Sequence, residues 1–229
     1  MEEQKFVNVR KEEYGLKQFV KKTFGKGKVS RVKIEYTPVG EKIIISTHRP
    51  GLIIGKSGES IARLTEVFKK NFKMENPHVD INEIKYPEFD AQIIADEIAL
   101  LLERFGSMRF KSISYKMLMR IKKAGALGCE SKTSGKLPSD RAKSWRFAFG
   151  YLKKTGDCSK VVDRAISVAE TKQGVIGIKV AILAPDAKIH DRIDLNEDIL
   201  NQIKRNAAFK EEEIPEKKKT TKKSKKIAK

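Results

Sequence analysis

The chain contains 229 residues, of which 49 are Lys or Arg and 30 are Asp or Glu, so its formal net charge is +19. Because surplus charge of one sign opposes compaction, this excess indicates a polyanionic partner rather than a requirement of the fold. A membrane-spanning or secreted protein is not expected, since no apolar run approaches the ~18 residues of a span and Met1–Lys5 lacks the apolar core of a secretory signal.

The N-terminal third changes several times between helical and strand periodicity. Apolar residues at helical spacing predict a helix over 11–24, and alternation predicts a strand over 32–36. A turn at Thr37–Gly40 leads to a second strand over 41–47, as in a hairpin. A helix over about 59–73 and a third strand near Val79–Ile81 follow. This order predicts an α+β unit with helices on one face of a small three-stranded sheet.

The most informative segment is Arg49–Gly58, which reads RPGLIIGKSG between the second strand and the next helix. A KH module uses this order to hold the backbone of single-stranded RNA. Glycine at both ends of Gly55–Gly58 lets peptide N–H groups approach phosphates, and the N-terminus of the next helix adds partial positive charge. Lys56 adds a full charge and Ser57 a hydroxyl donor. The predicted RNA-binding residues here are Arg49, Gly55, Lys56, Ser57 and Gly58.

Two other interpretations compete for this segment. It could be an ordinary surface turn that happens to contain glycines. It could also be a nucleotide-binding P-loop, because Gly51–Ser57 reads GxxxGKS. A P-loop has four residues between its first glycine and GK[ST], whereas this segment has three, and proline occupies position 50. The apolar Leu52–Ile54 also suits a buried helical turn better than a phosphate-wrapping loop.

Two helices are predicted next, beyond a connector at Lys85–Phe89 that contains Pro87. The first carries apolar residues from Ala91 to Phe105 on one face. The second, over about 109–123, separates its apolar and basic faces more sharply. Its basic stripe contains no acid, which favours a track for RNA phosphates over an ordinary solvated face. The predicted RNA-binding residues on this helix are Arg109, Lys111, Lys116, Arg120 and Lys123.

The remaining segment is predicted to be rich in β-structure. Alternation predicts strands over 147–151 and 176–182. Residues 161–171 fit either helical or strand spacing, and the Gly-Val-Ile-Gly turn that follows favours a strand. A short helix over 196–208 is expected to close the fold, and residues 210–229, with nine lysines and four glutamates, are expected to be disordered.

The predicted organisation has three parts. Residues 1–86 are predicted to form a KH domain, and residues 87–209 a second α/β domain with two helices on a mainly antiparallel sheet. Residues 210–229 form a lysine-rich tail. The tail carries a net +5, which leaves +14 on the rest, so the predicted domains are basic in their own right.

Trp145 lies among Arg141, Lys143 and Arg146, which are also predicted RNA-binding residues. Its indole could stack on an RNA base or pack in the core while the cations reach the surface, and the sequence favours neither. Cys129 and Cys158 lack CxxC spacing, so no disulfide or zinc site is expected. The three histidines are far apart, and no metal or other cofactor is expected.

Several segments resemble a known family, the universal small-subunit ribosomal protein number three in its archaeal and eukaryotic branch. The similarity covers about residues 15–185. It is carried by Tyr36–Lys42, Arg49–Gly58, Ala124–Glu130, Ser134–Leu137, Arg141–Lys143 and Gln173–Val180.

The resemblance implies that the KH domain is of type II and that the protein is a non-enzymatic, cytoplasmic component of the small ribosomal subunit. It implies contact with ribosomal RNA and neighbouring head proteins, and a place near the channel by which mRNA enters. Bacterial members carry an arginine pair, linked to unwinding mRNA, where this chain has Lys111 and Ser112. Tyr115 also replaces a nearby lysine, whereas Lys116 keeps a base, so the resemblance does not carry the unwinding role to these positions.

Two alternative functions remain open from the sequence. The chain could be a free-standing KH-domain regulator of mRNA, which sedimentation with small subunits would exclude. It could also act as a lyase on damaged nucleic acid, an activity that the resemblance implies for some eukaryotic relatives. No nucleophile or metal motif indicates such chemistry.

Overall fold

The computed structural model of the protein describes residues 2–38, 40–72, 74 and 76–189. The predicted helix over 196–208 and the predicted disordered tail over 210–229 lie outside the described residues. Two separate hydrophobic clusters stabilise the described part of the chain, one formed by the first seven elements and one by the elements after residue 90.

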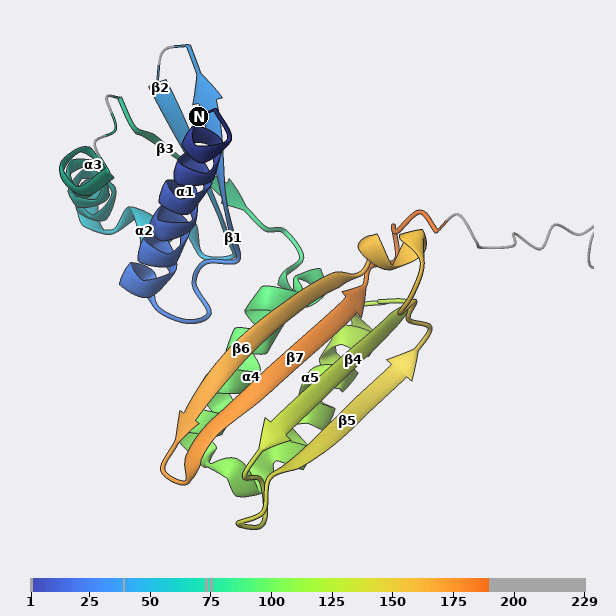
Figure 1. Cartoon of the computed structure of the whole chain (residues 1–229). Coiled ribbons are helices and arrows are strands. Elements are labelled where there is room, and N and C mark those ends of the chain that lie inside the picture. The colour runs from blue at the N-terminus through green and yellow to red at the C-terminus, as the bar shows by residue number, and fades with distance from the viewer. Residues whose placement is uncertain (1, 39, 73, 75, 190–229) are drawn as a thin grey trace, which may run out of the picture. The chain divides into compact units, whose positions relative to one another are not determined.

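The first group of elements builds a three-stranded sheet with helices packed on it (Figure 1). Strands β1 and β2 form the predicted antiparallel hairpin, and β3 adds parallel to β2. The predicted α+β architecture of this part is confirmed. In chain order the elements are α1 (Glu2–Phe24), β1 (Arg31–Thr37), β2 (Gly40–Thr47), α2 (Pro50–Ile54), a 3₁₀ turn (Lys56–Gly58), α3 (Glu59–Phe72) and β3 (His78–Glu83).

Sequence periodicity explains how this core forms. Ile43 and Ile45 point to the same side of β2 because strand side chains alternate, and both are fully buried. Leu64 and Phe68 lie one turn apart on α3 and complete the same cluster. Helix α1 begins at Glu2, earlier than the predicted residue 11. Its first turns carry Phe6, Val7 and Val9, but these side chains are exposed, so no core-facing stripe marks this part of the helix in the sequence.

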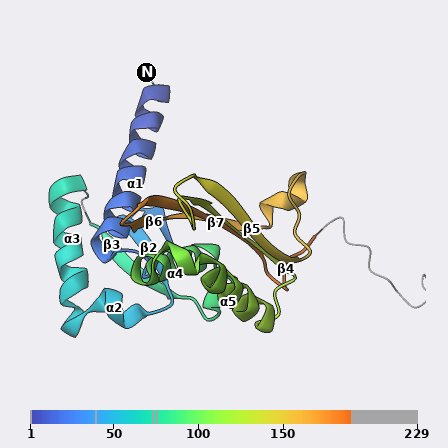
Figure 2. The ribbon, with the colours of Figure 1, turned by 90° about the horizontal axis from the view of Figure 1, so that it is seen from below.

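The second group forms a four-stranded antiparallel sheet in the order β5-β4-β7-β6. Helices α4 and α5 lie on one face of this sheet in both views (Figures 1 and 2). This arrangement confirms the predicted α/β fold of the second part. The elements are α4 (Ala91–Phe105), α5 (Phe110–Lys123), β4 (Gly128–Gly135), β5 (Lys143–Gly150), β6 (Asp163–Thr171) and β7 (Gly174–Leu183), with 3₁₀ turns at Pro87–Phe89, Ser107–Arg109 and Asp157–Lys160.

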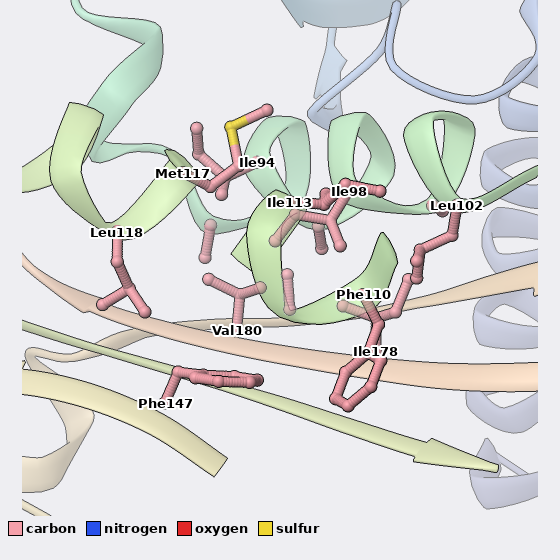
Figure 3. Close-up of a cluster of buried hydrophobic side chains, with 14 of the residues drawn as sticks. Ile94, Ile98, Leu102, Phe110, Ile113, Met117, Leu118, Phe147, Ile178 and Val180 are labelled. Carbon is pink, nitrogen blue, oxygen red and sulfur yellow. The ribbon is translucent and has the colours of Figure 1, made fainter. Parts of the chain in front are cut away.

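The core of this second group lies between the two helices and the sheet. Figure 3 shows Ile94 and Ile98 of α4 and Phe110 of α5 above Ile178 and Val180 of the sheet. Asp90 fixes the start of α4, since its carboxylate accepts hydrogen bonds from the N–H groups of residues 92 and 93 at 2.9 and 3.2 Å.

Two sequence expectations about the strands need correction. Strand β4, which lies between β5 and β7, was not predicted because Gly, Ser and Lys dominate it and its buried positions are small. Strand β5 covers Lys143–Gly150, so it begins before residue 147 and leaves Tyr151 outside. The ambiguous segment 161–171 contains β6, in agreement with the prediction of a strand.

No helix within the described ranges is long and apolar enough to cross a membrane. In the same part of the chain, no group of three or more His, Cys, Asp or Glu residues is placed to hold a metal ion. Cys129 and Cys158 are both free and buried. Burial raises the pKa of the Cys129 thiol to about 12, so this side chain remains a protonated core group.

Candidate nucleic-acid interface

The glycine loop begins where α2 stops. Ile53 is fully buried and holds α2 against the core, while the Gly55 N–H donates to the carbonyl oxygen of Gly51 at 3.0 Å. Gly55 then has φ 74° and ψ −173°, a conformation that is open essentially to glycine alone. Ser57 has φ 52°, and Gly58 has φ 80°. These successive positive φ values turn the chain from α2 into α3.

The loop presents cations to solvent. Lys56, Ser57 and Arg49 are exposed, and neither Lys56 nor Arg49 forms an ion pair with a described residue. One acid stands beside the loop, because Glu59 occupies the first turn of α3. Its carboxylate accepts from Arg63 at 2.6 Å, one turn further along the same helix. The loop therefore combines an exposed backbone, a helix N-terminus and two free cations.

Helix α5 carries the second predicted group of RNA-binding residues. Arg109, Lys116 and Lys123 are exposed, and none of the three forms an ion pair with a described residue. The Arg109 guanidinium lies over the Phe105 ring, 5.8 Å from its centroid. Lys116 and Lys123 line a pocket together with Glu97 and Leu101 of α4 and other residues of α5. These three cations can reach an anion without breaking an existing pair.

Arg120 differs from its neighbours on the same stripe. Its Nη1 donates to both carboxylate oxygens of Glu97 at 3.1 and 3.0 Å, and its Nε and Nη2 donate to Glu88 at 3.2 and 3.0 Å. Burial alone would lower the pKa of Arg120, but these hydrogen bonds and charges outweigh it and raise the pKa. The stripe itself contains no acid, as the sequence indicates; the acids come from α4 and the connector before it.

Trp145 belongs mainly to the protein core. Its ring contacts Phe110 with a centroid separation of 5.6 Å, and the Lys111 ammonium covers it at 4.6 Å from the ring centroid. The packing favours the core interpretation over an indole that is free to stack on a base. Lys111 remains exposed, so its charge is still available to an anion above the ring.

The basic residues around Trp145 are not equivalent. Arg141 and Lys143 are exposed and form no ion pair within the part of the chain that the structure describes. The Arg146 Nε donates to Glu130 at 2.7 Å, and Lys154 also contacts that carboxylate at 2.9 Å. Burial opposes ionisation of Glu130, but the hydrogen bonds from Lys154 and Arg146 outweigh it and lower its pKa. Arg146 is therefore already paired with a carboxylate, which it shares with Lys154.

The fold and these surfaces can be compared with known proteins. A family model described as a KH domain matches residues 15–89, which contain the glycine loop. A second model, described as ribosomal protein S3, C-terminal domain, matches residues 98–182, which contain α5 and the four-stranded sheet. The small ribosomal subunit protein uS3 of Methanocaldococcus jannaschii is 37% identical over 199 residues, which cover 86% of this chain and 95% of that protein. This chain belongs to the uS3 family.

Other archaeal uS3 proteins show the same extent of similarity. The protein of Archaeoglobus fulgidus is 38% identical over 196 residues, 85% of this chain and 84% of its own length. That of Saccharolobus solfataricus is 36% identical over 196 residues, 85% of this chain and 82% of its own length. The resemblance to this family is thereby confirmed. uS3 is a family of structural ribosomal proteins and not of enzymes.

Family membership decides between the interpretations of the glycine loop. The KH match contains the whole of Arg49–Gly58, so the loop is the KH-type loop and neither a P-loop nor an incidental turn. The individual RNA-binding residues, on the loop, on α5 and around Trp145, stay predictions. They differ in exposure and pairing: Lys56, Lys116 and Lys123 are exposed and form no ion pair with a described residue, whereas carboxylates hold Arg120 and Arg146.

Proposed function

We propose that this protein is a structural component of the small ribosomal subunit that binds ribosomal RNA through its KH loop and the cations of α5. The observation that supports the proposal most directly is the loop at Gly55–Gly58. It lies on the surface, its backbone is free of Cβ atoms at both ends, and Lys56 has no acidic partner among the described residues. Single-stranded phosphate backbones bind at sites of this kind.

The α5 face would supply a second, less specific contact. Lys116 and Lys123 of α5 and Arg109 in the turn just before it are exposed and form no ion pair with a described residue, so binding a phosphate requires none of those pairs to break. Such contacts neutralise phosphates and release counterions, which makes affinity depend strongly on salt. Phosphate contacts position the protein without reading sequence, so RNA shape would choose the site.

We further propose that the protein lies in the subunit head near the channel by which mRNA enters, in the cytoplasm, with mRNA and neighbouring head proteins as partners. Three exposed cations on and just before α5, without an ion pair to any described residue, suit a surface that a moving single strand passes, because each contact is weak and independent of sequence. Sedimentation tests the association with the subunit, since a ribosomal component travels with small subunits in equal number. A free-standing regulator of mRNA would remain mostly unbound.

The RNA-binding role of the loop can be tested by replacing Lys56 and Ser57 with Asp. The double variant should bind a single-stranded rRNA fragment at least tenfold more weakly at low salt, because attraction at the loop becomes repulsion. Each lost phosphate contact should also reduce the slope of log affinity against log salt by about 0.7. Both positions are exposed, so the circular dichroism spectrum and Tm should change little.

A matched control keeps this test specific. Lys69 and Lys70 are exposed near the C-terminal end of α3, so Lys69→Asp with Lys70→Gln lowers the net charge by three, as the loop variant does, at a distance from the loop along the helix. The control should retain most of the affinity. Unchanged affinity in the Asp double variant, with its fold intact, would exclude a phosphate-binding role for the loop.

A further inference from the structure

The four-stranded sheet has a second face that α4 and α5 do not cover (Figures 1 and 2). Alternation along each strand sends the core residues to the helices and the intervening residues to this other side. We call it the open sheet face and define it by Lys132, Arg146, Ile166, Val168, Val175 and Lys179, all of which are exposed.

A row of cations crosses this face. In the strand register, Lys132 of β4 lies opposite Lys179 of β7 on one side and opposite Arg146 of β5 on the other. Neighbouring strands are about 4.8 Å apart, so like charges are held close together, which is destabilising for a sheet. Arg146 is paired with Glu130, but neither Lys132 nor Lys179 forms an ion pair with a described residue.

An aliphatic patch adjoins the row. Ile166 of β6 lies directly opposite Lys179, and Val168 and Val175 extend the patch toward the β6–β7 turn. These side chains are 63%, 42% and 62% exposed, respectively. Exposed apolar side chains grouped beside polar residues mark protein contact sites more often than isolated ones do. Glu170, opposite Val175, is the acid at the far end of this patch.

We propose that the open sheet face docks an acidic amphipathic segment of another protein. Its carboxylates would pair with Lys132 and Lys179, and its apolar side chains would cover Ile166, Val168 and Val175. The dimensions agree, because acids at positions i and i+4 of a helix are about 5–6 Å apart and the two lysines lie on adjacent strands. Docking would also relieve the repulsion between the two lysines.

RNA fits this face less well than an acidic protein segment. Single-stranded RNA is held by aromatic rings on which its bases stack. The aromatic residues of β5, at positions 145, 147 and 149, all pack toward the helices instead. The open face therefore offers unpaired lysines and aliphatic surface but no stacking platform from these strands. A second copy of the chain is disfavoured as well, because each copy carries +19.

The proposal is independent of the KH loop and can be tested on the full chain with defined probes. One probe is a labelled 20-residue peptide with Glu on one helical face and Leu on the other. The second probe is the same peptide with Gln for Glu, and the third is a 12-nucleotide oligouridylate. Fluorescence anisotropy at 150 mM salt gives the Kd of each probe for the wild type and for three variants.

The variants separate the open face from general basicity. Lys132→Gln with Lys179→Gln removes both unpaired lysines, and Lys69→Gln with Lys70→Gln removes equal charge from α3. Ile166→Ser shortens the aliphatic patch. The first double variant should bind the acidic peptide about tenfold more weakly, and the α3 control less than twofold. Oligouridylate affinity should be the same for both double variants, and Ile166→Ser should also weaken peptide binding.

Thermal denaturation gives a second readout, in which the lysine double variant should lose no stability although it binds the peptide more weakly. Because removing the two opposed like charges relieves their repulsion, the Lys132→Gln and Lys179→Gln double variant should have a Tm equal to or above that of the wild type. The proposal is overturned if the α3 control weakens peptide binding equally, which would mean nonspecific attraction. It is also overturned if oligouridylate binding falls more than peptide binding, which would assign the face to RNA.

Discussion

The loop at Gly55–Gly58 illustrates how single residues determine the geometry of a binding surface. Gly55 adopts a conformation that only glycine reaches without strain, and a Cβ there would lie 2.4 Å from Ser60 Oγ. Ser57 keeps a positive φ although it is not glycine, which stores about 1–2 kcal/mol of strain. The loop is therefore held in shape by α2 on one side and α3 on the other.

Replacing Gly55 with Ala should destabilise the protein by about 2 kcal/mol, because backbone strain adds to the steric conflict with Ser60. Gly51 provides the matched control, since it lies in α2 with a negative φ and has open space where a Cβ would be. Gly51→Ala should be neutral or slightly stabilising. Urea denaturation measures both. Equal stability of the two variants would contradict the strained geometry.

At the level of elements, the neighbours of α5 decide which of its cations are free. The basic stripe is uniform in sequence, yet Arg120 is tied to Glu88 and Glu97 whereas Lys116 and Lys123 are not. The guanidinium therefore links α5 to α4 and to the connector before α4. This bidentate geometry is one that arginine provides and lysine does not.

Arg120→Gln should lower the free energy of unfolding by about 1 kcal/mol, a value kept small because the side chain is 43% exposed and solvent screens the pair. Its effect on RNA affinity should be smaller than that of Lys116→Gln, which removes an unpaired charge from the same helix. Thermal denaturation and RNA titration of the two variants test this. A loss of affinity without a loss of stability in Arg120→Gln would show that the arginine serves RNA instead.

At the scale of the whole molecule, the net charge affects both the choice of partner and the stability of the folded state. The net charge of +19 favours a polyanionic partner and disfavours the free folded state through self-repulsion. Carboxylates that bind two cations, such as Glu130 with Arg146 and Lys154, offset part of this repulsion locally. Acidification protonates such carboxylates, which breaks their ion pairs and raises the net positive charge of the protein at the same time.

Stability should therefore fall as the pH drops below about 4.5. The pKa of Glu130 is lower in the folded state than its ordinary value of 4.5. Its contribution is fully present above that ordinary value and is lost as the pH falls through the lower, folded-state pKa. Glu130→Gln should cost stability at pH 7 and flatten the acid limb of a Tm-against-pH curve. An acid limb identical to that of the wild type would show that Glu130 does not contribute to the loss of stability in acid.

The sequence predicted the elements correctly where their pattern lies within one short segment. The KH loop depends on glycines at fixed spacing, and the helices and most strands depend on the periodicity of buried residues such as Ile43 and Ile45, Leu64 and Phe68. Strand β4 could not be found in this way. Its residues have low strand propensity, and its place between β5 and β7 depends on pairing with distant segments.

By itself, the sequence determined the α+β class, the position of the KH-type loop, the basic character and the resemblance to the uS3 family. Only the tertiary structure decided which cations are free, because Glu88 and Glu97 reach Arg120 from other elements and Glu130 reaches Arg146 across a strand pair. It also placed Lys132 opposite Lys179, which are 47 positions apart in the chain numbering. Ion pairs and strand registers join residues that are distant in the chain, and spacing along a sequence does not encode those distances.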